Sequence, residues 1–485
     1  MNDEGKQGLT KNALGLLDSI VMAVAGTAPA YSISATTAVL IGAVGMQSPA
    51  ALLWSGIPMF GVVMSFFYLN RWQANSGASY AWVGRALTPE LGFLAGWALI
   101  IASTVFMVAG SFPAGSVTLA ILDPKWSNNL LAVTLVGGFF FLLISFVIMM
   151  GIRITVKVQW MMSSIELVIL IISGIVAVFK FGAHPLHPFN WSWFSISSFP
   201  SISTFFAGAL VAAFYYWGWD VSANLSEETK NSNRNPGIGP IVGIVFLFAV
   251  FELFTVATQV SMTTKMINNA STDILQQMGI MLYGPQWGNI VVLAVILSTI
   301  ATLETSLLQV TRTLFSMGRD RVIAPSFSKI HAKWQTPYVA SIFVTTFALA
   351  LFVLANFLPS IGAVMSDAIN AIGLQVVFYY ALAAISVIVF YRKIAFRSVA
   401  NFIFIFLWPL IAAVFLITVG IFEVPSLNIE TNIVGIGLLA IGIVPMLWAR
   451  MKKRVSFFYE SRQHFNPTVQ VDAVQVDAIE KIQNS

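Results

Sequence analysis

Acidic residues inside hydrophobic stretches are the part of this sequence with the clearest chemical potential. Five of them lie where the chain should cross a membrane: Glu166, Asp220, Glu252, Glu304 and Asp367. A charged side chain at the bilayer centre costs roughly 2.5–3.5 kcal/mol on insertion scales. Most of these acids should therefore face the protein interior or water, or carry a proton, and the alternative for some is a position near the membrane surface. No Lys or Arg is expected deep in a span, so the interior favours a positively charged cargo, a proton, or both.

Two of the hydrophobic stretches are interrupted at corresponding places. The first carries Ala25-Gly26-Thr27-Ala28-Pro29, and the sixth carries Tyr216-Trp217-Gly218-Trp219-Asp220. A helix broken inside a bilayer leaves backbone N–H and C=O groups without partners, which is tolerated only where they face protein or a water-filled cavity. Paired breaks at matching places in two halves of a chain indicate the substrate site of a secondary transporter.

Aromatic residues crowd the second interruption. Aromatic faces attract ammonium groups by roughly 0.5–2 kcal/mol, most strongly when water is excluded. Because 13% of the chain is aromatic, membrane packing is the alternative explanation. The coincidence with the break favours a role in binding for the cluster Phe214, Tyr215, Tyr216, Trp217 and Trp219.

The composition places most of the chain in lipid. It is 58% hydrophobic and 9% charged, with a mean hydropathy of +0.83, whereas soluble domains carry roughly 25% charged residues. A span needs about 20 apolar residues. Twelve stretches meet this requirement: 13–44, 50–70, 92–121, 129–150, 157–179, 201–225, 238–261, 286–315, 338–357, 363–391, 399–421 and 432–450.

The basic residues predict the orientation of these spans. All Lys and Arg residues fall on one side of the predicted membrane except Lys125, Lys180 and Lys265. The positive-inside rule therefore places both termini in the cytoplasm of a protein of the cell membrane. An even number of spans is required for this arrangement, so the two predictions agree.

Several function classes are disfavoured by composition. The chain has no cysteine, which excludes a disulfide-linked subunit. Its net charge of +5 comes from basic loops and does not indicate nucleic-acid binding. The sequence has no phosphate-binding loop of the Walker type, and its four histidines form no convincing metal site. We expect neither an enzyme nor a cofactor or metal.

Three sequence motifs in order resemble those of the amino acid–polyamine–organocation superfamily of permeases, over about residues 10–455. The first is Asn75-Ser76-Gly77-Ala78-Ser79-Tyr80 with Gly92-Phe93-Leu94-Ala95-Gly96-Trp97. The second is Gly218-Trp219-Asp220 with Ser226-Glu227-Glu228-Thr229-Lys230-Asn231 and Arg234-Asn235-Pro236. The third is Arg319-Asp320-Arg321 with Pro325, His331 and Thr336-Pro337.

The resemblance implies a fold and its division along the chain. The expected fold is an all-α membrane protein of twelve transmembrane helices with a leucine-transporter-like arrangement. It has two inverted five-helix repeats, broken helices 1 and 6, and two extra helices. The expected segments are a cytoplasmic tail (1–12), the first repeat (13–179), the second repeat (201–391), the extra helices (399–450) and a second cytoplasmic tail (451–485).

The resemblance also implies a binding site at the two breaks. In this fold the exposed amides and positive helix end of span 1 take a substrate carboxylate, and carbonyl groups take its ammonium. Gly26, Thr27 and Ala28 are expected to supply these amides. Here only Gly26 of the usual two glycines is present, and Pro29 has no N–H to donate. This departure favours a substrate that is an amine without a carboxylate. The expected substrate-binding residues are Ala25, Gly26, Thr27, Ala28, Tyr31, Ser32, Phe214, Tyr215, Tyr216, Trp217, Gly218 and Asp220.

The resemblance also points to residues that would couple transport to protons and to residues that would form a gate. Some relatives carry a proton-binding lysine in span 5, and Glu166 falls at that position. Burial raises the pKa of a carboxyl group, so Glu166 is expected to exchange protons, with Asp220 and Glu304, or else to pair with a substrate ammonium. An inner gate of ion pairs is expected from Arg85, Glu227, Glu228, Lys230 and Arg319, with solvated loop charges as the alternative.

These expectations combine into a secondary active transporter of amino acids or related amines, with proton-coupled uptake by alternating access. Its partners are a small-molecule substrate, protons and the lipid bilayer. The alternatives are a polyamine or alkanolamine permease, a substrate exchanger, a membrane sensor that keeps the fold without transport, and a channel.

Overall fold

The computed structural model describes residues 8–127, 129–270, 273–355, 361–451 and 457–458. In these residues the regular structure is helical apart from one isolated bridge between Leu14 and Thr229, so the all-α prediction is confirmed. Residues 1–7 and most of the predicted second tail (452–456 and 459–485) lie outside the described residues. The division into tails and repeats therefore stays a prediction.

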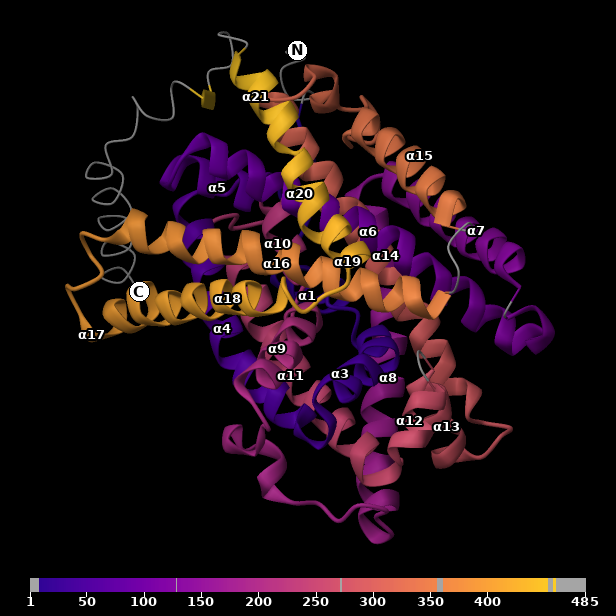
Figure 1. Cartoon of the computed structure of the whole chain (residues 1–485). Coiled ribbons are helices and arrows are strands. Elements are labelled where there is room, and N and C mark those ends of the chain that lie inside the picture. The colour runs from indigo at the N-terminus through magenta and orange to yellow at the C-terminus, as the bar shows by residue number, and fades with distance from the viewer. Residues whose placement is uncertain (1–7, 128, 271–272, 356–360, 452–456, 459–485) are drawn as a thin grey trace.

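The first half of the chain forms the helices drawn in indigo and purple in Figure 1. They are α1 (Leu16–Gly26), α2 (Pro29–Tyr31) continued by η2 (Ser32–Thr36) and α3 (Thr37–Val44), α4 (Ser48–Trp72), α5 (Ser79–Ala86), α6 (Pro89–Leu122), α7 (Leu130–Met149) and α8 (Ile152–Ala183).

The second half continues from magenta to yellow in the same view. Its helices are α9 (Ile202–Tyr215), α10 (Val221–Asn224), α11 (Asn235–Ser261), α12 (Thr264–Ala270), α13 (Ile274–Tyr283), α14 (Asn289–Arg319), α15 (Tyr338–Leu354), α16 (Ile361–Tyr391), α17 (Val399–Asn401) with η10 (Phe402–Leu407), α18 (Trp408–Glu423), α19 (Ile429–Asn432) with η11 (Ile433–Gly437), α20 (Leu438–Ile441) and α21 (Ile443–Met451).

The helices are long and apolar enough for a multi-pass membrane protein. Nine helical stretches of the described chain meet this requirement, and the apolar helices α9 and α15 are shorter. The first stretch, Leu16–Trp72, contains two of the predicted spans. The exact number of crossings and the inverted repeat stay predictions.

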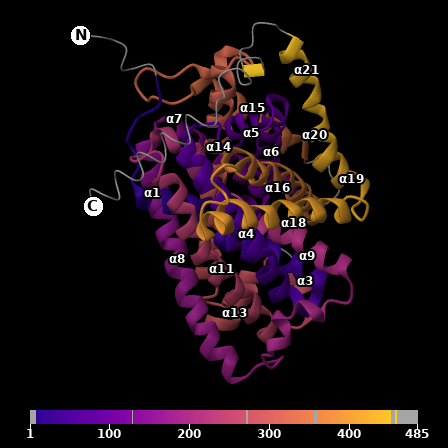
Figure 2. The same cartoon turned by 90° about the vertical axis from the view of Figure 1, so that its left-hand side faces the viewer.

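The helices form a buried centre and an apolar outside. α6 packs against α14, α16 and α7, and α1 packs against α11. α16 and α18 lie side by side in both views (Figures 1 and 2). α14 is buried along most of its length, whereas α7, α8 and α18 expose large apolar side chains such as Phe139, Phe179 and Val414. Such a surface suits contact with lipid.

Both predicted interruptions are present, and they contact each other. α1 ends at Gly26, and Ala28 takes the left-handed conformation (φ 53°) before Pro29 opens α2, a position where proline is favoured. α9 ends at Tyr215, and Gly218 has φ +97° before α10 begins. A Cβ atom on Gly26 would overlap the carbonyl group of Gly218, and a Cβ on Gly218 would overlap that of Gly26. The two breaks therefore meet backbone to backbone.

This contact predicts that neither glycine tolerates a side chain. We expect Gly26→Ala and Gly218→Ala to lower the free energy of unfolding by about 1–3 kcal/mol, the usual cost of overpacking. Gly218→Ala should be the more severe because its positive φ also disfavours any L side chain. Thermal unfolding of the detergent-solubilised protein measures the effect.

The matched control is Gly42→Ala in α3, where no atom lies within 4 Å of an added Cβ. Alanine is the better helix former by about 1 kcal/mol, so this variant should be neutral or more stable. Equal stability of all three variants would show that the two breaks do not pack as described.

Candidate substrate site and gate

The first backbone amides at the break in α1 are occupied by the chain itself. The N–H of Thr27 donates to the carbonyl of Val24, and the N–H of Ala28 donates to that of Ala25, both at an N···O distance of 3.1 Å. Gly26 still belongs to the helix. The expectation of free amides at Gly26, Thr27 and Ala28 is therefore wrong for this structure, because the last turn of α1 winds on to Ala28 and uses these donors.

A glutamate from α8 reaches the next donor. The N–H of Ala30 donates to Oε1 of Glu166 (N···O 2.9 Å), and the N–H of Tyr31 donates to Oγ of Ser298 in α14 (3.2 Å). Glu166 is 1% exposed, and within the described residues its Oε2 has no hydrogen-bond partner. Two neighbouring helices thus supply the acceptors at the start of α2.

Carbonyl groups at the same break also have partners. Oγ1 of Thr302 in α14 donates to the carbonyl of Ala25 (2.7 Å). The hydroxyl of Ser32 donates to the carbonyl of Thr27 (3.0 Å). The predicted site residues Ala25 and Ser32 therefore hold the break together in this conformation.

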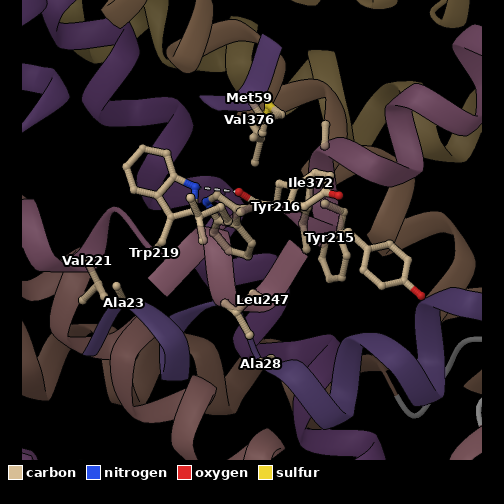
Figure 3. Close-up of a cluster of buried hydrophobic side chains, with 14 of the residues drawn as sticks. Ala23, Ala28, Met59, Tyr215, Tyr216, Trp219, Val221, Leu247, Ile372 and Val376 are labelled. Atoms are coloured by element: carbon tan, nitrogen blue, oxygen red, sulfur yellow. Dashed lines mark hydrogen bonds between the residues drawn. The ribbon is translucent and has the colours of Figure 1, made fainter. Parts of the chain in front are cut away.

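A chain of hydrogen bonds organises the break between α9 and α10. Nε1 of Trp217 donates to the hydroxyl of Tyr379 (2.7 Å), which donates to Oδ2 of Asp220 (2.9 Å). Asp220 is fully buried, and its Oδ1 has no partner in the described part of the chain. Nε1 of Trp219 donates to the carbonyl of Tyr216 (2.7 Å; Figure 3). Sequence reasoning missed Tyr379, whose only signal was a tyrosine hydroxyl inside a span.

Four aromatic rings, from α2, α6, α9 and the segment between α9 and α10, meet beside the first break and form what we call the aromatic cluster. Tyr31 packs edge-on against Phe106 of α6, with ring centroids 5.4 Å apart. Phe214 and Trp217 lie 6.3 and 5.9 Å from Phe106. Tyr31, Phe214 and Trp217 are among the predicted site residues, and Phe106 was not predicted.

Tyr215 and Tyr216 lie in the same hydrophobic core as the aromatic cluster but contact other residues (Figure 3). Tyr215 hydrogen-bonds Thr37 and packs against Phe251 of α11. The hydroxyl of Tyr216 donates to the carbonyl of Leu52 in α4 (3.2 Å). The structure gives both rings packing contacts away from the aromatic cluster, although they follow Phe214 directly in sequence.

The remaining acids make no hydrogen bond to either break within the described residues. Glu304 is fully buried in α14, and neither carboxyl oxygen has a partner among the described residues. Residues two apart on a helix do not share a face, so Glu304 points away from the side on which Thr302 contacts Ala25. Asp367, near the start of α16, accepts hydrogen bonds from Asn428 and Thr431. Glu252 on α11 is partly buried.

Two ion pairs join the segment after α10 to the end of α14. Glu227 and Arg319 form a two-pronged pair with N···O distances of 2.8 and 2.9 Å. Glu228 pairs in the same way with Arg312 (3.0 and 3.2 Å), and both side chains are completely buried. Arg312 was missed from the sequence. Its signal was the seven-residue spacing to Arg319, which puts both on one helix face.

Two predicted gate residues take other partners. Arg85 donates to the side chain of Gln73 (2.7 Å). Lys230 donates its backbone N–H to the carbonyl of Leu14 (2.8 Å), and the N–H groups of Ala13 and Leu14 donate to the carbonyl of Glu228. The expectation that Arg85 and Lys230 pair with the glutamates is not met in this conformation.

The two ion pairs should differ sharply in their effect on stability. We expect Glu228→Gln to lower the free energy of unfolding by about 3–5 kcal/mol, because it leaves the buried Arg312 unpaired. Glu227→Gln should cost no more than about 1 kcal/mol, because solvent reaches that pair.

Chemical denaturation in detergent measures both effects. The double variant Glu228→Leu with Arg312→Met removes both charges and should recover most of the loss. A Glu228→Gln variant as stable as Glu227→Gln would contradict the buried pair.

Comparison with known proteins supplies the family. A family model described as amino acid permease matches residues 14–444. The low-affinity putrescine importer of Escherichia coli (strain K12) is 25% identical over 378 residues, which cover 73% of this chain and 78% of that protein. The branched-chain amino acid permease of Bacillus subtilis (strain 168) is 27% identical over 294 residues, which cover 57% and 60%.

A third relative is the vacuolar cationic amino acid transporter 4 of Arabidopsis thaliana, 23% identical over 374 residues that cover 72% of this chain and 60% of the relative. This chain thus spans 60% of the length of two of these three relatives. The family match extends from the residues before α1 to α21. The chain belongs to the amino acid permease family of the amino acid–polyamine–organocation superfamily.

Proposed function

We propose that this permease is a secondary active transporter that carries an amino acid or a related amine across the cell membrane, coupled to protons. The observation that carries the proposal is the contact between the two helix breaks, with Glu166 and Asp220 beside them. Each carboxyl group has one buried oxygen without a partner within the described chain. Broken helices with such acceptors suit a cationic group in the interior.

The names of the relatives support the cargo class. They include a putrescine importer, a branched-chain amino acid permease and a cationic amino acid transporter. Putrescine and the cationic amino acids share a net positive charge, which agrees with carboxylates at the breaks. The proposal therefore covers amino acids and amines.

Alternating access needs contacts that break when one side opens. We assign this role to the pairs Glu227–Arg319 and Glu228–Arg312, because they tie the segment after α10 to α14. By the positive-inside rule this end of the molecule faces the cytoplasm with both termini. The conformation described here then has its inner gate closed.

Uptake into proteoliposomes tests the proposal. Radiolabelled putrescine, lysine and leucine are offered under an inwardly directed proton gradient, and accumulation that collapses with a protonophore is expected for at least one of them. Accumulation that ignores the protonophore would exclude proton coupling, and absence of uptake or exchange for all three would contradict the proposed transport.

Replacement of Asp220 tests its part in coupling. Asp220→Asn keeps an oxygen for the hydrogen bond from Tyr379 but cannot ionise or exchange a proton. We expect gradient-driven uptake to fall at least about tenfold, on the scale of one lost charged interaction, while the thermal unfolding profile in detergent stays cooperative. Asp367→Asn, which changes an acid away from the breaks, is the control and should retain uptake. Wild-type uptake by Asp220→Asn would remove this residue from the mechanism.

The ion pair between Glu227 and Arg319 also leads to a prediction about the pH dependence of uptake. Burial raises the pKa of Glu227, but the hydrogen bonds and charge of Arg319 outweigh this, so the pKa lies below its ordinary value of 4.5. A lowered pKa means that the pair stabilises the fold above about pH 4.5 and loses that contribution as pH falls through the folded-state value. Glu227 is therefore ionised throughout the range from pH 5.5 to 7.5.

We expect Glu227→Gln to change the rate of uptake and to leave the shape of its pH profile between pH 5.5 and 7.5 unaltered. Initial rates at five pH values, normalised to the maximum of each variant, give this comparison. A flattened profile in Glu227→Gln would assign proton sensing to the gate instead of the interior acids.

A further inference from the structure

The carboxylate of Glu166 lies where a transporter of this fold would expose amides to an anionic cargo. Every backbone N–H from residue 27 to residue 32 has a partner within the chain, and Pro29 has none to offer. Most of these donors close turns of the main chain or meet the neutral Ser298. The N–H of Ala30 alone meets a carboxyl group from another helix. A carboxylate of the protein thus occupies the donor that a cargo carboxylate would need.

The second oxygen of Glu166 is the unexplained part of this arrangement. It is buried and meets no hydrogen-bond partner at bonding distance within the described residues, and the polar side chain beside the carboxyl group is the neutral Ser298. None of the ion pairs formed by those residues includes Glu166. A buried carboxylate without a counter-charge is unfavourable, and a cation that arrives from outside would supply what is missing.

The aromatic cluster begins one residue from this carboxylate. Tyr31 follows Ala30 in sequence, and its ring packs against Phe106 and Phe214. Aromatic faces attract ammonium groups and give nothing comparable to a carboxylate. The carboxylate of Glu166 and the aromatic rings therefore both favour an ammonium group.

We propose that Glu166 acts as a built-in carboxylate that makes the site selective for amines lacking a carboxylate of their own. The cargo's ammonium group would pair with the free oxygen of Glu166 beside the aromatic cluster. The carboxylate of an amino acid would find the Ala30 donor taken and would be repelled by the like charge. This inference rests on the proposed function, since it names the substrate class of the same site.

Matched pairs of ligands that differ by one carboxylate test the inference directly. Putrescine is compared with ornithine, cadaverine with lysine, and ethanolamine with serine, by calorimetric titration of the purified full chain in detergent and by uptake into proteoliposomes. At least one amine should bind at least tenfold tighter than its amino acid. Amino acids that bind as tightly as their amines would overturn the inference and leave the proposed transport intact. If no member of any pair binds or is carried, the proposed function fails as well, and the inference fails with it.

Two variants of Glu166 separate its charge from its position. Glu166→Gln keeps an oxygen for Ala30 but has no charge, so amine affinity should fall at least tenfold. Glu166→Ser withdraws the group from Ala30 and should shift the ratio of amine to amino acid affinity at least tenfold toward the amino acid. The control is Glu423→Gln, which changes a buried acid at the end of α18 that hydrogen-bonds Ser426, and it should keep the wild-type ratio. Unchanged amine affinity in Glu166→Gln would overturn the inference. The wild-type pair comparison decides the question even if a variant does not fold.

Discussion

The backbone contact between Gly26 and Gly218 is the constraint on which the rest of the interior depends. It brings two breaks almost two hundred residues apart in sequence to one point. Because neither glycine has a side chain, the carbonyl groups approach closely and the helix ends on both sides keep a fixed relation. The acids and aromatic rings that surround the breaks can converge on one place only if this contact is kept.

Several polar groups around the breaks are satisfied by side chains of α14 and α16. Ser298 and Thr302 of α14 and Tyr379 of α16 each satisfy a group that the breaks or their acids present. Other buried polar atoms of the described residues have no partner, among them Oε2 of Glu166, Oδ1 of Asp220 and the hydroxyl of Ser222 in α10. Unsatisfied buried oxygens cost stability, and the two carboxyl oxygens beside the breaks are acceptors that a mobile cation would satisfy.

Local composition was sufficient to predict the break positions and the burial of the interior acids. A glycine or proline inside an apolar span interrupts a helix, and an acid inside a span must turn inward. The partners could not be predicted in the same way, because contacts such as Glu166 with Ala30 or Arg312 with Glu228 join residues far apart in sequence. The expectation of free amides at the first break was wrong because the last turn of α1 continues past Gly26. No residue type in this segment predicts the extra turn.

The residues before α1 add a connection of a different kind. Ala13 and Leu14 exchange main-chain hydrogen bonds with Glu228 and Lys230, in the segment that follows α10. These bonds use only backbone atoms, so they do not depend on the side chains of the residues that form them. An alanine scan would pass over the connection entirely, although it ties the first broken helix to the second at the end where the ion pairs lie. Main-chain hydrogen bonds thus couple the two broken helices. The side chains of the residues that form these bonds can change during evolution while the coupling is kept.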